Sequence, residues 1–191
     1  MIPQLTQLAR LFACALPAWL LLRGGWLLLR RRTLRPWREA AMAVFVAFMA
    51  GVMLMALKGQ WAAPSDMLAS AAERLRTMDR IHLRPMQTIG PQVQALPEIT
   101  AVTQLLGNTL LFAPWGFFLP LLWPRFRHAG RMAAMALGLT LLIETTQLFI
   151  NRYVEIDDVL LNFLGAMLGA GAWAVLHRRW PKLDALFLAD A

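Results

Sequence analysis

Long apolar runs constrain the fold of this chain more than any other feature of its sequence. A helix needs about 20 residues to cross the hydrocarbon core of a bilayer, and several runs approach that length. Hydrophobic residues make up 59% of the chain, above the roughly 45–50% typical of soluble domains. These patterns predict an all-α polytopic membrane helix bundle with about five transmembrane helices, in a single membrane domain over residues 1–191. The expected spans cover about residues 11–29, 40–57, 102–123, 132–150 and 159–176.

The first run is the least regular, because Arg23, Gly24 and Gly25 interrupt it. That interruption, and the lack of a small-residue cleavage site after the run, argue against a secretory signal peptide. We therefore count run 11–29 among the spans and leave open whether it crosses the whole membrane. Cys14, the single cysteine of the chain, lies in this run. One cysteine gives neither a disulfide framework nor a thiolate metal site.

The basic residues indicate how the chain is oriented. The net charge is +8 at pH 7, but Lys and Arg form short clusters beside the apolar runs instead of a face for nucleic acid, so we predict no nucleic-acid partner. Three clusters fall on one side if every run spans. By the positive-inside rule this side is the cytoplasm, which puts the N-terminus outside and the C-terminus in the cytoplasm. The clusters are Arg30, Arg31, Arg32, Arg35 and Arg38; Arg125, Arg127 and Arg131; and Arg178, Arg179 and Lys182.

The same topology makes residues 58–99 an extracytoplasmic loop, the longest polar segment of the chain. Within it, Ser65 and Asp66 are candidates to cap the N-terminus of a short amphipathic helix that continues through Arg76. Such a helix fits either the membrane surface or a solvated loop, and both alternatives stay open.

The stretch from Ile143 to Gly169 holds most acid and amide side chains of the C-terminal half. Glu144 and Gln147 share a helix face, because residues three apart on a helix are neighbours. A carboxylate inside an apolar helix is costly, so by default it marks a functional site. The topology brings this stretch to the outer end of the bundle. The candidate ligand-binding residues there are Asn108, Glu144, Gln147, Arg152, Asp157, Asp158 and Asn162.

Several of these features also have a structural interpretation. Gly165 and Gly169 form a small-xxx-small pattern, which lets helices pack closely. Arg152 would neutralise Asp157 or Asp158, or extend to the lipid headgroups, and the charged cluster would then lock the fold without binding anything. The amide of Asn108 fits a contact between helices as well as a place in the site.

Metal and cofactor sites are not indicated by the sequence. His82, His128 and His177 lack the clustered spacing that a metal site needs. We predict no tightly bound structural metal and no cofactor, and leave open a divalent ion held loosely on the carboxylates.

The motifs also form a recognisable set: Asn108 to Gly116, Glu144-x-x-Gln147, Arg152, Asp157-Asp158-x-x-x-Asn162 and Gly165-x-x-x-Gly169. Over about residues 81–176 this set resembles the VanZ-like family, small bacterial membrane proteins whose named member is associated with teicoplanin resistance. Two positions depart from the family pattern. Asn151 stands where the family often has Gly, and Asn also tolerates the left-handed conformation of a helix end. His82-Leu-Arg-Pro85-Met86 replaces a loop motif with Asn and Pro-Phe.

The resemblance implies a location in the bacterial cytoplasmic (inner) membrane and a role in the cell envelope, without an established reaction. Two function classes follow. The first is an accessory protein whose outer polar pocket binds a lipid-linked headgroup or a glycopeptide, with Arg152 on an anionic group. The second is an intramembrane enzyme in which Glu144 and Asp157 or Asp158 share acid and base roles. We favour the first, since no distinctive catalytic motif is present, and assign no catalytic residue. A transporter is disfavoured, because the spans show no internal repeat. Membrane lipids are the expected surroundings and partners.

Overall fold

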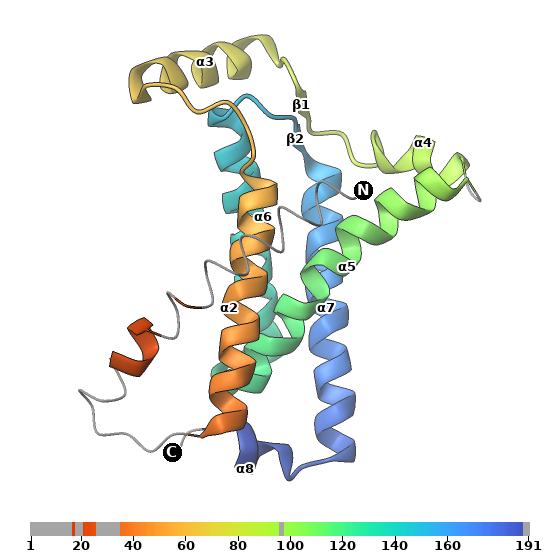
Figure 1. Ribbon diagram of the computed structural model, residues 1–191. Helices are drawn as coiled ribbons and strands as arrows, with labels where there is room; N and C mark the ends of the chain where they lie inside the picture. The colour runs from red at the N-terminus through yellow and green to blue at the C-terminus, as the bar shows by residue number, and fades with distance from the viewer. Residues whose placement is uncertain (1–16, 18–20, 26–34, 96–97, 189–191) are drawn as a thin grey trace.

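The computed structural model describes residues 17, 21–25, 35–95 and 98–188, without the side chains of residues 99–104 and 108. Cys14 and most of the predicted run 11–29 lie outside these residues. Within them, four helices are long and apolar enough to cross a membrane, and they form an elongated bundle (Figure 1). This confirms the predicted all-α membrane helix bundle. The four helices are α2 (Pro36–Ala56), α5 (Ile99–Leu122), α6 (Ala129–Phe149) and α7 (Ile156–Arg179), with Leu105–Leu122 as the spanning part of α5.

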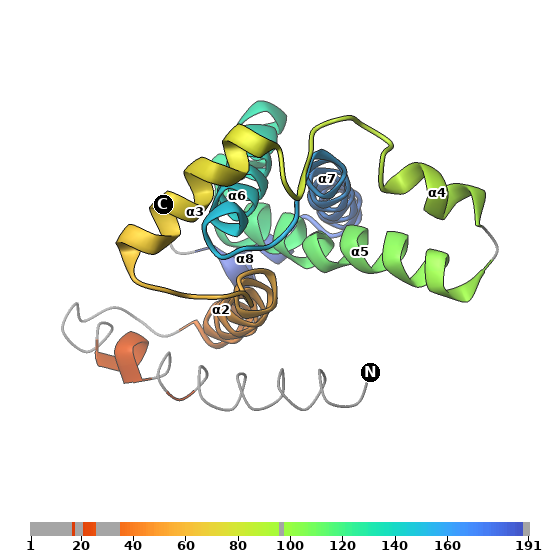
Figure 2. The same ribbon diagram turned by 90° about the horizontal axis from the view of Figure 1, so that it is seen from above.

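Short elements cover both ends of the bundle (Figure 1). We call one the α3 end, where α3 lies across the end of α6, as seen from above in Figure 2. We call the other the basic end. The α3 end carries α3 (Pro64–Thr77), β1 (Ile81–His82), α4 (Ile89–Gln94) and β2 (Val154–Glu155). The basic end carries the 3-10 helix η1 (Pro124–Arg127) and α8 (Leu183–Phe187).

Helix α3 is the amphipathic helix predicted through Arg76, but the expected N-cap was wrong. The helix begins at Pro64, because proline fits the first helical position, where its missing N–H is not needed. Ala63 is the N-cap and makes no side-chain hydrogen bond. Ser65 and Asp66 therefore lie inside the first turn, where the Asp66 carboxylate favours the positive end of the helix dipole.

Helices α5 and α7 run in the same direction and are in backbone contact. A Cβ added at Gly165 would lie 1.8 Å from the carbonyl oxygen of Thr109, and one added at Gly169 would lie 1.9 Å from that of Ala113. Gly116 of α5 approaches the backbone of α7 equally closely. Real Cβ contacts never come this near, so any side chain at these positions would force the helices apart. The packing interpretation of the Gly165 and Gly169 stripe is thus confirmed.

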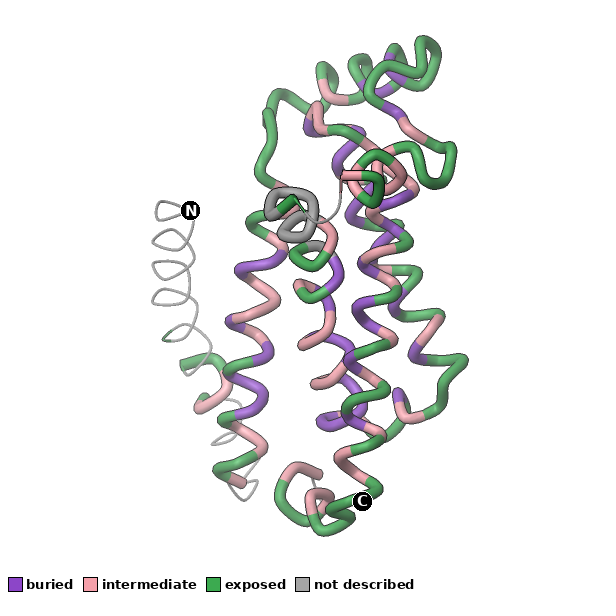
Figure 3. Tube along the Cα trace, turned by 90° about the vertical axis from the view of Figure 1, so that its right-hand side faces the viewer, coloured by how far each residue is buried: buried purple, intermediate pink, exposed green. Residues whose placement is uncertain are grey.

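Each span has a buried face and an exposed one, which alternate along the chain (Figure 3). The buried faces form one apolar core that includes Phe112, Trp115, Leu119, Met132 and Ala136. The exposed faces remain apolar: they include Leu141, Leu142, Leu160, Leu164 and Leu168, which are between 45% and 63% exposed. Apolar side chains on both faces are what a helix between a protein core and lipid requires.

Arginines hold the basic end together. Arg38 donates from Nη1 to the carbonyl oxygens of Leu122 (3.0 Å) and Phe187 (2.7 Å). Arg127 forms a two-pronged ion pair with Asp184, at 2.8 and 2.6 Å. This guanidinium holds the pKa of Asp184 below its ordinary value. The pair therefore stabilises the docked α8 at neutral pH, and its contribution is lost as the pH falls through that lowered pKa. These contacts gather the segments around α2, η1 and α8 at one end.

Candidate functional site

The C-terminus of α6 is shaped by Asn151. Its φ of 58° lies in the left-handed region, as expected for the residue after a helix. The next amide, from Arg152, returns to the carbonyl oxygen of Gln147 at 3.1 Å, which closes a Schellman-type turn. Asparagine tolerates this conformation better than other non-glycine residues. The turn directs the chain sharply from α6 into β2.

Two candidate residues, Gln147 and Arg152, donate to backbone carbonyls at the end of α2 and just after it. Gln147 donates from Nε2 to Ala56 at 3.2 Å. Arg152 donates from Nη1 to Met55 and Lys58, each at 3.2 Å. A cation near the C-terminus of a helix complements its dipole. Both side chains therefore join α6 to α2 and support the site structurally.

Arg74 makes the corresponding contacts at the end of α6, and the sequence analysis missed it. This side chain is only 4% exposed. Its Nη1 donates to Leu148 at 2.5 Å, and its Nη2 donates to the carbonyl of Arg152. Burial, followed by the charge of Arg80, lowers the pKa of Arg74 from its usual value. The available signal was a charged residue three positions after Ala71, next to the apolar side of the predicted amphipathic helix.

The two short strands bring the long polar loop to the candidate site. β1 and β2 pair in parallel, with Ile81 opposite Val154 and His82 opposite Glu155. The Nδ1 atom of His82 lies 3.5 Å from Oε1 of Glu155, and no hydrogen-bond partner for this buried nitrogen occurs among the described residues. His82 and Glu155 were absent from our candidate set, because their pairing depends on strands far apart in the sequence.

Glu144 lies beside this strand pair, buried in α6 with 4% of its surface exposed. Its Oε2 accepts a hydrogen bond of 2.9 Å from the backbone N–H of Glu155. Its Oε1 is buried and has no hydrogen-bond partner in the described part of the chain. The charges of Asp158, Glu155 and Arg152 all act on this carboxylate. A buried acceptor without a donor costs free energy, so this oxygen calls for a partner that the described residues do not supply.

Asp157 has a different environment, in which both of its oxygens are occupied. Oδ1 accepts from the N–H of Met86 at 2.7 Å, and Oδ2 accepts from Thr88 at 2.8 Å and Ile89 at 3.0 Å. The side chain is 1% exposed. Met86 is held in the left-handed region, with φ of 67°, which is unfavourable for a residue with a side chain. Asp157 therefore anchors the segment that precedes α4.

The remaining candidates are placed as follows. Asp158 is half-buried and Asn162 is buried, both within the first two turns of α7. Asn108 is part of α5, and its side chain lies outside what the structure describes. In the described ranges, no three His, Cys, Asp or Glu side chains are arranged to hold a metal ion.

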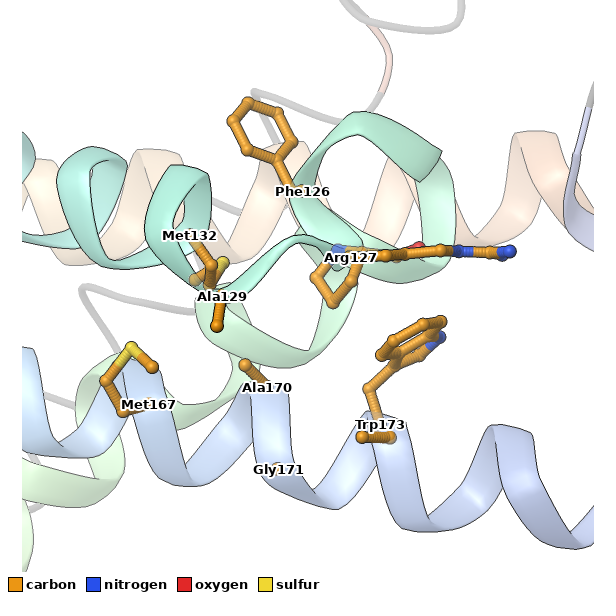
Figure 4. A pocket seen from close by; sticks show the side chains of 10 residues that line it. Phe126, Arg127, Ala129, Met132, Met167, Ala170, Gly171 and Trp173 are labelled. Atoms are coloured by element: carbon orange, nitrogen blue, oxygen red, sulfur yellow. The ribbon is translucent and has the colours of Figure 1, made fainter.

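The described cavities include one of about 220 Å³ at the basic end, lined by Pro120, Phe126, Arg127, Met132, Trp173 and their neighbours (Figure 4). Figure 4 shows the Arg127 side chain extended over the Trp173 ring, with 4.9 Å between the guanidinium carbon and the ring centre. This cavity lies far along the bundle from Glu144, so it is separate from the candidate site.

Together, the apolar helices and the buried carboxylate at the α3 end define a polytopic α-helical membrane protein with a polar end. Comparison with known families identifies the family of this membrane protein. The VanZ/LLP1 family model matches residues 30–177, which is most of the chain, and the protein belongs to this family. The match contains the segment of the predicted resemblance and extends it through α2. No curated protein and no solved structure matches the chain.

Proposed function

We propose that the α3 end faces the outside of the bacterial inner membrane and binds a polar group of a cell-envelope ligand, either a lipid-linked headgroup or a glycopeptide. The protein would then act as an accessory in envelope processes or antibiotic resistance. The observation that carries this proposal is the buried Oε1 of Glu144, which has no partner among the described residues. Buried polar atoms in native proteins nearly always have a partner, and each exception requires an explanation. A ligand that donates a hydrogen bond supplies one.

The chemistry around Glu144 favours a ligand rich in donors. The carboxylates of Glu155 and Asp158 act electrostatically on the Glu144 carboxyl group. Ionised carboxylates accept hydrogen bonds but donate none. An ammonium group or the hydroxyls of a sugar match such a site. Arg152 uses Nη1 to bind α2, and we assign its other donors to an anionic part of the ligand.

The enzyme alternative rests on the same carboxylate. Asp157 accepts hydrogen bonds from three backbone amides and anchors the loop before α4, so we assign the second carboxylate of the reaction to Asp158, whose charge acts on Glu144. His82 is a further candidate, since its buried Nδ1 also lacks a hydrogen-bond partner in the described segments. Glu144 and one of these groups would divide general acid and general base roles on a lipid-linked substrate.

Orientation is tested by labelling single cysteines in a Cys14→Ser background. Tyr153→Cys, at a position 54% exposed at the α3 end, is expected to react with a membrane-impermeant thiol reagent in intact cells. His128→Cys, at the basic end, is expected to react only after permeabilisation. The reason is that the clustered arginines stay on the cytoplasmic side. Labelling of the His128 position alone in intact cells would reverse the orientation and place Glu144 inside.

The site itself is tested with Glu144→Gln. Glutamine keeps an oxygen for the Glu155 amide but removes the charge, so membrane abundance should stay close to wild type. Hydrogen bonds to charged groups are worth about 1.5–3 kcal/mol, so affinity for the ligand should fall by about tenfold or more. Glu73→Gln is the control, because this carboxylate is exposed on α3 and pairs with Arg76.

Two readouts separate the functions. In a teicoplanin-sensitive host, Glu144→Gln should abolish any change in teicoplanin susceptibility that the wild-type chain confers. With purified protein, a rise in melting temperature on adding teicoplanin or a soluble disaccharide pentapeptide supports the binder, provided Glu144→Gln weakens it. If lipid extracts instead change in mass on incubation with wild type but not the variant, the enzyme alternative holds. A normal phenotype and unaltered binding in Glu144→Gln would remove Glu144 from the site.

A further inference from the structure

Three arginines around η1 differ in what they contact. Arg127 is held by the carboxylate of Asp184. Arg125 and Arg131 are exposed, and neither has a carboxylate partner within 4.0 Å among the described residues. The guanidinium carbon of Arg125 lies 4.8 Å from the ring centre of Phe126, a cation–π contact that favours one position of this charge. At the basic end, two exposed guanidinium groups thus lack a carboxylate partner within the described part of the chain.

These two arginines line the same cavity. It is a shallow, open surface pocket of about 450 Å³, lined by Arg125, Phe126, Arg131, Ala134 and Met135. Apart from the two guanidinium groups, the lining consists of apolar side chains. A cavity with two cations and otherwise apolar walls matches a ligand that has an anionic head and an apolar body.

The face of α6 below Arg131 continues this apolar wall along the span. Ala134, Met135, Gly138 and Leu142 follow Arg131 at helical spacing, so they form one stripe. Met135 is 41% exposed and Leu142 is 63% exposed. At Gly138 an added Cβ would meet no atom within 4 Å, which leaves an open shallow track on the helix surface. An acyl chain that starts at the cavity can lie along this track.

We propose that this cavity is a binding site for an anionic phospholipid. The phosphate lies between the guanidinium groups of Arg125 and Arg131, which are suited to phosphate geometry, and one acyl chain follows the exposed stripe of α6. Basic pockets at the ends of membrane helices recognise anionic headgroups in this manner. The site is at the opposite end of the bundle from Glu144, so it does not depend on the proposed function.

The test uses purified full-length chain and phosphatidylglycerol, with lipid retention measured by native mass spectrometry and by competition with a fluorescent phosphatidylglycerol. Each arginine near a charged lipid surface contributes about 1 kcal/mol, or roughly fivefold in affinity. The double variant Arg125→Gln/Arg131→Gln should therefore bind phosphatidylglycerol about 25-fold more weakly. Its melting temperature in detergent should match wild type, because both side chains are exposed.

The matched control is Arg178→Gln/Arg179→Gln, which removes two exposed charges from the same end. This control should retain wild-type binding, and phosphatidylcholine should bind far more weakly than phosphatidylglycerol to the unaltered chain. Equal losses in the two double variants would overturn the site in favour of a diffuse basic surface. Competition by glycerophosphoglycerol or inorganic phosphate as effective as that by the lipid would overturn the role of the acyl track.

Discussion

Replacing Asp157 by alanine is expected to lower the free energy of unfolding by about 3 kcal/mol or more, because each buried donor left without an acceptor costs about 1–3 kcal/mol. The carboxylate accepts three backbone hydrogen bonds from Met86, Thr88 and Ile89. Without it these N–H groups lose their acceptor, and Met86 no longer has a contact that offsets its left-handed backbone. The segment before α4 should then detach from α7.

Hydrogen exchange followed by mass spectrometry checks this result directly. Amides in residues 83–95 should exchange faster in Asp157→Ala, while those in the middle of α5 and α7 stay protected. Asp157→Asn should be intermediate, because it keeps one acceptor oxygen. Asp79→Asn is the control, since the Asp79 side chain is 64% exposed. A variant with wild-type exchange and stability, but without the cellular phenotype, would show that Asp157 binds a ligand.

Gly169→Leu is expected to cause the second large loss. Overpacking costs about 1–3 kcal/mol and occasionally more, and here the obstacle is the backbone carbonyl of Ala113, only 1.9 Å from the position of an added Cβ. A backbone atom cannot move aside as a flexible side chain can. Gly169→Ala should therefore already lower the melting temperature in detergent, and leucine should lower it further.

Gly171→Ala is the matched control on the same helix. An added Cβ at Gly171 meets nothing within 4 Å, and alanine favours the helix over glycine by about 1 kcal/mol. This variant should melt at or above the wild-type temperature. If Gly169→Leu and Gly171→Ala melt alike, α5 and α7 are not in backbone contact.

The parts of the fold that the sequence predicts are those governed by local patterns. Apolar runs gave the helices that contain Glu144 and Asn162, because lipid-facing and core-facing positions are both apolar over a whole span. The spacing of Gly165 and Gly169 predicted a close contact between helices, which the structure shows between α5 and α7. Ser65 was a weaker case, because serine and proline both favour helix starts and Pro64 took the first position.

The candidate site was predicted as a region, but the role of each residue was not. Which backbone groups a side chain meets depends on loops distant in sequence, as with Arg74 and the end of α6. The sequence of a polar residue at a helix end does not show whether its side chain bonds to a neighbouring helix end, as Gln147 does, or faces a ligand. Glu144 differs from these through an oxygen that has no hydrogen-bond partner among the described residues, which no sequence pattern reveals.

The contact between α5 and α7 also sets the order in which the bundle is completed during synthesis. The two helices are separated in the chain by all of α6, yet they approach each other through Gly116, Gly165 and Gly169. A ribosome delivers the N-terminal segments first, so α5 enters the membrane without the partner that its glycine face requires. Until α7 arrives, the backbone carbonyls of Thr109 and Ala113 on α5 lack this packing partner. The close contact between α5 and α7 therefore forms only after α7 has been made, and a nascent chain released after α6 would lack it.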